Sequence, residues 1–325
     1  MEAWLDWGIP LIVALQSSGE WLLAPMHLLS LLGSEAFYLL IMPAVVWCLD
    51  VRAGLRMGLV LLTSACLNSL LKLAFGWPRP YWVSDQVRAL AHESSFGFPS
   101  GHAQNALAMW GTLAIVLRRR GAVIALGGLI LFISLSRLYL GVHFPTDVLG
   151  GWFFAAILLL MVAWVERPLE RWLVNRPLGV QLLAPIALSI ALLVLGLLVA
   201  QRSIDRPVPA AWIAAAGAAF PQEGPIDPQS SNGVVSAAGT LLGLGVGAVL
   251  LRGWGRFRAE GSVTQRLARL AAGLLGILIL YYGLGAMRPH DADAWAQVMR
   301  FANYALVGLW VSFGAPWTFV RLRLA

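Results

Sequence analysis

Apolar runs long enough to cross a lipid bilayer recur from residue 36 onward, and they constrain the fold more than any other feature of the sequence. Inside a membrane only helices and closed barrels satisfy their backbone hydrogen bonds, and a helix needs about 20 apolar residues to cross. The runs are continuous, whereas barrel strands alternate in polarity. Because 59% of the residues are hydrophobic and only 12% are charged, the sequence predicts an all-α, polytopic transmembrane helical bundle.

About nine runs have the length of a span. They are residues 36–49, 55–75, 102–118, 121–141, 146–165, 177–200, 233–251, 265–287 and 296–318. Residues 8–33 are also apolar, but a polar stretch and Pro25 interrupt them. We interpret this segment as interfacial or re-entrant helices, with a tenth, imperfect span as the alternative.

Most of the 23 Lys and Arg residues fall in alternate loops. This basic set comprises Arg52, Arg56, Arg118, Arg119, Arg120, Arg167, Arg171, Arg176, the arginines from Arg252 to Arg269, Arg321 and Arg323. Positive charge favours the cytoplasmic side, so the opposite set of loops faces out of the cytoplasm. The net charge of +7 therefore reports topology and gives no indication of a nucleic-acid partner.

Two features of the C-terminal part have simple structural interpretations. Gly239, Gly243 and Gly247 are spaced four apart on one helix face, which predicts close helix packing rather than a dimer seam. Residues 201–232 are rich in proline and form a long outward loop. We interpret this loop as a connector, with a lid as the alternative.

Three polar clusters lie at outward-facing span ends, where charged groups are costly and need a functional explanation. The first is Lys72 with Arg79 and Pro80, the second is Pro99-Ser100-Gly101-His102, and the third is Ser136-Arg137 with His143 and Asp147. Lys72 is the only lysine of the chain, which elsewhere uses arginine for positive charge. All three clusters fall on the same side of the predicted bundle.

These clusters contain the groups of a phosphate site. They are the side chains of Lys72, Arg79 and Arg137, the free amides of Gly101 and His102, and Ser100 as helix N-cap. A helix N-terminus binds anions, and three cations match the charge spread over a phosphoryl group in transfer. Lysine supplies a point charge and arginine a planar fork, so the two are not interchangeable.

Two histidines have separate tasks available. Asp147 follows His143 by four residues, so its carboxylate can accept the Nδ1 proton and present the Nε2 lone pair to phosphorus. His102 lies at the end of the predicted cradle, where it can protonate the leaving oxygen and later activate water. The sequence thus predicts a phosphohistidine on His143. Asp147 is the only carboxylate of the clusters, too few for two metal ions, and we expect no metal or cofactor.

Each element also has a plainer interpretation when taken alone. Lys72 would be a residue whose charged end reaches the membrane surface, Arg79 a loop charge, and the His143–Asp147 pair a structural contact. A lipid-phosphate transporter or binding protein needs the cations but not a histidine pair. The coincidence of all three clusters on one side favours the enzyme.

The three clusters resemble the signature of the type 2 phosphatidic acid phosphatase superfamily, which includes lipid phosphatases, glucose-6-phosphatase and vanadium haloperoxidases. Lys72 precedes Arg79-Pro80 by the expected spacing, Pro99-Ser100-Gly101-His102 follows, and Ser136-Arg137, His143 and Asp147 complete it. The resemblance implies His143 as nucleophile, His102 as acid–base and a core of about six helices. The membrane composition speaks against a haloperoxidase.

The apolar runs and the resemblance together predict three regions, although no motif assigns the C-terminal one. Residues 1–35 form the N-terminal interfacial or re-entrant helices, residues 36–200 a phosphatase core, and residues 201–325 an outward loop with a three-helix transmembrane extension. We expect an integral-membrane hydrolase of lipid phosphate or pyrophosphate, in contact with membrane lipids, whose site faces the periplasm or outside from a bacterial inner membrane. The alternative is a glucose-6-phosphatase-like hydrolase of a soluble sugar phosphate.

Overall fold

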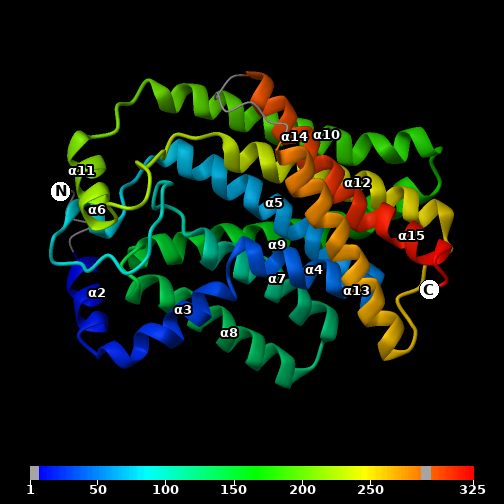
Figure 1. The fold of residues 1–325 in the computed structure, drawn as a ribbon, viewed down its shortest axis with the longest axis horizontal. Coiled ribbons are helices and arrows are strands. Elements are labelled where there is room, and N and C mark those ends of the chain that lie inside the picture. Colours follow the sequence, from blue (N-terminus) through cyan, green and yellow to red (C-terminus); the bar gives the residue numbers. More distant parts are fainter. Residues whose placement is uncertain (1–6, 287–293) are drawn as a thin grey trace. The chain divides into compact units, whose positions relative to one another are not determined.

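The computed structural model describes residues 7–286 and 294–325, and the regular structure within these residues is all helical (Figure 1). The elements are α2 (Gly8–Gln16), η1 (Glu20–Leu22), α3 (Leu23–Leu31), α4 (Glu35–Cys48), α5 (Val51–Phe75), α6 (Pro80–Val83), α7 (Gly101–Leu117), α8 (Arg120–Tyr139), α9 (Pro145–Val174), α10 (Leu178–Ile204), α11 (Ala210–Ala219), α12 (Asn232–Trp254), α13 (Val263–Leu278), η2 (Ile279–Gly283), α14 (Ala294–Leu309), η3 (Trp310–Gly314) and α15 (Ala315–Arg321).

Each predicted span coincides with one of these helices or a run of them, which confirms the all-α transmembrane fold class. Residue 287, the end of the span predicted at 265–287, lies outside the described residues. Among the described helices, six are long and apolar enough to cross a bilayer. A seventh span results if Glu20–Leu31 and Glu35–Cys48, bent by 49°, form one broken span. The count of nine spans stays a prediction, since α7 has only 17 residues.

The helices extend beyond the apolar runs that predict them. Helix α9 continues to Val174, through Glu166, Pro168 and Arg171, although its apolar run ends near residue 165. A proline costs a helix one backbone hydrogen bond but does not always end it. Charged residues expected in loops therefore lie on the polar ends of helices.

The chain divides into two compact units, and four helices, α4, α5, α9 and α10, contribute to both. Unit 1 comprises residues 1–37, 67–158 and 196–231, and unit 2 comprises residues 38–66, 159–195 and 232–325. The predicted division at residues 35 and 200 follows the sequence, whereas these units are discontinuous, and that division stays a prediction. Every residue of the three polar clusters belongs to unit 1.

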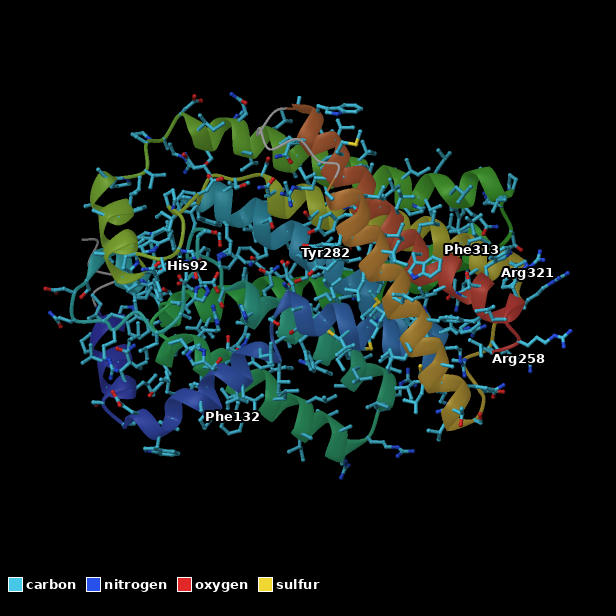
Figure 2. All side chains as sticks on the ribbon, viewed as in Figure 1. His92, Phe132, Arg258, Tyr282, Phe313 and Arg321 are labelled. Atoms are coloured by element: carbon cyan, nitrogen blue, oxygen red, sulfur yellow. The ribbon has the colours of Figure 1, made fainter. Side chains whose placement is uncertain are left out.

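Unit 1 is built on aromatic and aliphatic packing between its N-terminal helices, the segment around α6 and the proline-rich loop at residues 201–232. Helices α2 and α3 pack on α8, and α11 packs on α6 (Figure 1). Its core includes buried side chains from these segments, among them Ile12, Trp82, Phe96, Leu140 and Phe144. Burial of such side chains in a bundle fixes the loops that carry the polar clusters. Phe132 on α8 is half exposed, as expected of a surface that faces lipid (Figure 2).

Unit 2 is held by close contact between α12 and α14. A Cβ atom on Gly239 would lie 2.5 Å from the Phe301 carbonyl oxygen, and one on Gly243 or Gly247 would also collide with the facing segment. The prediction of close helix packing at these glycines is therefore confirmed. Arg258 and Arg321, both from the basic set of loops, project at the same end of this unit (Figure 2).

Candidate active site

The second polar cluster forms a capped helix N-terminus. Ser100 is extended and its hydroxyl accepts a hydrogen bond from the Ala103 amide at 3.5 Å. The Ser100 amide donates to the Asp147 carbonyl at 2.9 Å, which ties the start of α7 to the start of α9. Gly101 and His102 are the first residues of α7, where amides have no helical acceptor. A Cβ on Gly101 would lie 3.0 Å from the Asn68 side-chain oxygen, so the tight fit favours glycine.

Lys72 lies in the last turn of α5 and points into the loop that precedes α7. Its ammonium group donates to the Ser95 hydroxyl at 3.0 Å and to the Phe96 carbonyl at 2.6 Å. The side chain is 9% exposed, so it does not extend to the surface in the way a snorkelling lysine does. Two of its three donors are used by the loop.

Arg79 is fully buried and organises the same loop. It precedes the short helix α6, in which Pro80 occupies the first position. Its Nε donates to the Ser95 carbonyl at 2.7 Å, and its Nη1 donates to the Val142 carbonyl at 2.9 Å. The guanidinium group thus joins the loop before α7 to the segment between α8 and α9.

Arg137 lies in the last turn of α8 and is 2% exposed. Its Nη1 donates to the Ser30 hydroxyl of α3, and its Nη2 forms an ion pair with Glu93. The same Glu93 carboxylate contacts Arg79 Nη2 at 3.4 Å. Two of the three predicted phosphate-binding cations therefore meet at one carboxylate.

His143 and Asp147 form a buried pair at the start of α9. The Nδ1 and Oδ2 atoms are 3.1 Å apart, and Oδ2 also accepts from the Phe144 amide at 2.9 Å. This places the Nδ1 proton between the two residues and leaves Nε2 unprotonated, 3.3 Å from Arg79 Nη1. Burial, and then the charge of Arg79, lower the pKa of His143 well below its ordinary value. The imidazole is therefore neutral at neutral pH.

Three residues near these clusters were missed by the sequence analysis. Glu93 lies in the loop between the first two clusters. It is the only glutamate of that loop, and this is the sequence feature by which it could have been identified. Ser30 comes from the N-terminal segment, 107 residues from Arg137 in sequence, and nothing in the sequence marks it. Tyr81 contacts Glu93, because its hydroxyl donates a hydrogen bond to the Glu93 carbonyl. Glu93 therefore adds a second carboxylate to the site, beside Asp147 of the third cluster.

The proline-rich loop at residues 201–232 packs directly on this region. The Trp212 ring of α11 lies 6.1 Å from the Trp82 ring, and the Phe220 ring contacts the rings of both Tyr81 and His92. Figure 2 marks the position of His92. A cavity of about 160 Å³ lies between this loop and the segment before α7; it is lined by Gly76, Phe96, Ser203, Arg206, Pro207, Val208, Pro209 and Trp212. Part of the loop is therefore a wall beside the polar clusters rather than a free connector.

Comparison with known proteins identifies the family. Residues 53–170 match the PAP2 superfamily, and residues 235–325 match the PAP2 superfamily phosphatase, transmembrane extension. Phosphatidylglycerophosphatase B of Bacillus subtilis (strain 168) is 36% identical over 128 residues, 37% of this chain and 61% of that protein. Sphingosine-1-phosphate phosphatase 2 of Homo sapiens is 32% identical over 144 residues, which are 41% of this chain and 35% of that protein. Glucose-6-phosphatase 3 of Bos taurus is 28% identical over 200 residues, which are 53% of this chain and 56% of that protein.

The chain spans less than two thirds of the length of each of these relatives. A solved structure, that of a transmembrane PAP2-type phosphatidylglycerolphosphate phosphatase from Bacillus subtilis, is 30% identical and covers 49% of this chain and 86% of its own, with a TM-score of 0.41. The three polar clusters all fall within residues 53–170, and the C-terminal helices match the extension of the same family. This integral membrane protein belongs to the PAP2 superfamily.

Proposed function

We propose that the protein is a membrane phosphatase that transfers the phosphoryl group of a lipid phosphate or pyrophosphate to His143 and then to water. The observation that carries this proposal is the buried His143–Asp147 pair, whose unprotonated Nε2 lies 3.3 Å from Arg79 Nη1. A nucleophile, an orienting carboxylate and a cation beside the reacting atom are the parts of covalent phosphoryl transfer.

In the first step the lone pair of His143 Nε2 forms a bond to phosphorus, and the bond from phosphorus to the ester oxygen breaks. His102 donates a proton to that oxygen, so that a neutral alcohol leaves, or a lipid monophosphate if the substrate is a pyrophosphate. The Asp147 carboxylate holds the Nδ1 proton throughout and stabilises the positive charge that develops on the ring.

In the second step His102 accepts a proton from water as the water oxygen attacks phosphorus. The bond from phosphorus to Nε2 breaks, its electron pair returns to His143, and inorganic phosphate leaves. In both steps Lys72, Arg79 and Arg137, together with the Gly101 and His102 amides, stabilise the charge on the phosphoryl oxygens. This mechanism requires no metal ion or cofactor.

A lipid substrate is favoured by the surroundings of the site. The polar clusters lie at the ends of apolar helices, and an apolar-walled cavity adjoins the loop that carries Phe96. Two of the relatives named above are phosphatases of lipid phosphates by their names. We propose that the site opens on the extracytoplasmic face of a bacterial inner membrane, because the basic loops lie on the other side in sequence.

A soluble sugar phosphate is the second candidate substrate. The match to glucose-6-phosphatase 3 covers 200 residues, more than the matches to the two lipid phosphatases described above. The same catalytic residues would serve, and only the walls of the site would differ.

Phosphate release by purified protein in detergent tests the proposal. The substrates are phosphatidic acid, phosphatidylglycerophosphate, sphingosine phosphate, undecaprenyl pyrophosphate and glucose 6-phosphate, with His143→Ala as blank. We expect turnover of one or more lipids that His143→Ala abolishes. Glucose 6-phosphate hydrolysed at comparable efficiency would favour the second candidate, and equal release by wild type and His143→Ala would refute the phosphatase proposal.

A further inference from the structure

The Glu93 backbone is held by Tyr81, whereas its side chain is partly exposed. The Tyr81 hydroxyl donates to the Glu93 carbonyl at 3.1 Å and accepts from the Glu93 amide at 3.3 Å. The Glu93 side chain is 26% exposed, whereas those of Arg79 and Arg137 are 0% and 3% exposed. The carboxylate therefore reaches the two buried cations from the open side, and rotation of its side chain can release them without movement of the loop.

The carboxylate occupies donors that a phosphoryl group needs. It pairs with Nη2 of Arg79 through one oxygen and with Nη2 of Arg137 through the other. A phosphoryl group bridges arginines in the same way, with two oxygens on two guanidinium groups. A phosphoryl group that bridges the two arginines in this way takes the place of the carboxylate, because two anions beside the same pair of guanidinium groups would repel each other.

Arg137 retains an unused donor beside the carboxylate. Its Nε is buried and has no hydrogen-bond partner among residues 7–286 and 294–325. In a guanidinium group Nε and Nη2 lie on the same edge, which binds two oxygens of one anion side by side. Glu93 satisfies only the Nη2 end of this edge, because its other oxygen faces Arg79. A tetrahedral anion with three free oxygens can satisfy both ends and Arg79.

The charge state of Glu93 agrees with this contact. Burial alone would raise the pKa of Glu93, but Arg79 and Arg137 outweigh it, and the pKa lies below its ordinary value. Glu93 is thus an anion at neutral pH.

We propose that Glu93 is an internal substitute for the substrate phosphoryl group, which pairs with Arg79 and Arg137 in the free enzyme and turns outward when a phosphoryl group binds. This inference rests on the proposed phosphatase function. It assigns a specificity role to Glu93, because an anion must outcompete a carboxylate to enter. Inorganic phosphate, the product, is then bound weakly and released, while a substrate with further contacts still displaces Glu93.

The variant Glu93→Gln tests the proposal, since it keeps the size of the side chain and removes its charge. Because a neutral amide pairs with the arginines more weakly than a carboxylate does, the inhibition constant of inorganic phosphate should fall by about tenfold or more. Glu223→Gln, which removes an exposed charge from the same unit, is the matched control and should leave the constant unchanged. If Glu93 only positions the arginines, Glu93→Gln will weaken phosphate inhibition, and this result or no change overturns the proposal.

A second measurement uses the wild-type protein and does not depend on the folding of a variant. Carbodiimide with an amine couples to accessible carboxyl groups, and the modified peptide is measured by mass spectrometry. Saturating inorganic phosphate should increase modification of Glu93 several-fold and leave Glu223 unchanged. Unchanged or reduced modification of Glu93 overturns the proposal. Failure of the phosphatase proposal would look different from failure of the Glu93 proposal. In that case the wild-type protein would release no phosphate from any substrate, so that no inhibition by phosphate could be measured.

Discussion

Asp147→Asn removes the charge of the orienting carboxylate without changing its shape. Oδ2 of Asp147 accepts hydrogen bonds from both His143 Nδ1 and the Phe144 amide, and the side chain is fully buried. The asparagine amide can place its oxygen or its nitrogen at this position, and both orientations impair the histidine.

With the oxygen in place, both hydrogen bonds survive but the negative charge is lost. The loss of a charge-assisted hydrogen bond, about 2.7 kcal/mol, lowers kcat by about 10². With the nitrogen in place, it donates to Nδ1, and the proton moves to Nε2. That Nε2 proton would point at Arg79 Nη1, 3.3 Å away, and the nucleophilic lone pair would be lost. The loss then approaches about 10⁴, as in catalytic triads whose aspartate becomes asparagine.

The assay is phosphate release at saturating substrate, with the folded state checked by size-exclusion chromatography and thermal unfolding. Asp50→Asn is the matched control, because Asp50 accepts a hydrogen bond from the Ala53 amide at the start of α5 and asparagine caps a helix equally well. We expect kcat of Asp147→Asn to fall by at least about 10² and kcat of Asp50→Asn to stay at the wild-type value. A value of kcat for Asp147→Asn within about threefold of wild type would refute the orienting role.

Three further predictions concern the same site. Ser30→Ala removes the buried partner of Arg137 Nη1 and should lower kcat/KM by about tenfold or more. Ser17→Ala, at an exposed serine of the N-terminal segment, is the control and should leave kcat/KM unchanged. Equal values of kcat/KM for the two variants would contradict a role of α3 at the site. Burial, and then the charge of Arg79, lower the pKa of His143. NMR of histidine-labelled protein should therefore show a neutral His143 ring at pH 6.5 that is protonated only at lower pH. Titration of His143 at or above pH 6.5 would contradict its burial beside Arg79. EDTA should leave phosphate release intact, and activity that returns only with an added divalent ion would contradict the metal-free mechanism.

The sequence predicts the helices and the three clusters well, because both are encoded locally. A span needs a continuous apolar run, and Ser100 caps α7 through residues that are adjacent in sequence. The His143–Asp147 contact is likewise set by a spacing of four residues at the start of α9. The family resemblance is confirmed by the match to residues 53–170. It also extends further than expected, because residues 235–325 match the transmembrane extension of the family.

The contacts missed by the sequence analysis join segments that are distant in sequence. Ser30 meets Arg137 only because α3 packs on α8, and no local pattern records that packing. Glu93 lies in a loop, where periodicity gives no direction for a side chain, and its position depends on the clamp by Tyr81. Whether residues 8–33 cross the membrane depends on the 49° bend before α4, which length and composition do not reveal.

Trapping of the covalent intermediate is the sharpest test of a phosphohistidine on His143. Protein mixed with ³²P-labelled substrate is quenched within its first turnover in alkali, where a phosphohistidine survives, and the labelled peptide is identified. We expect alkali-stable, acid-labile label on His143 that appears before free phosphate and is absent from His143→Ala. Single-turnover release of phosphate with no labelled protein, or label on another residue, would contradict it.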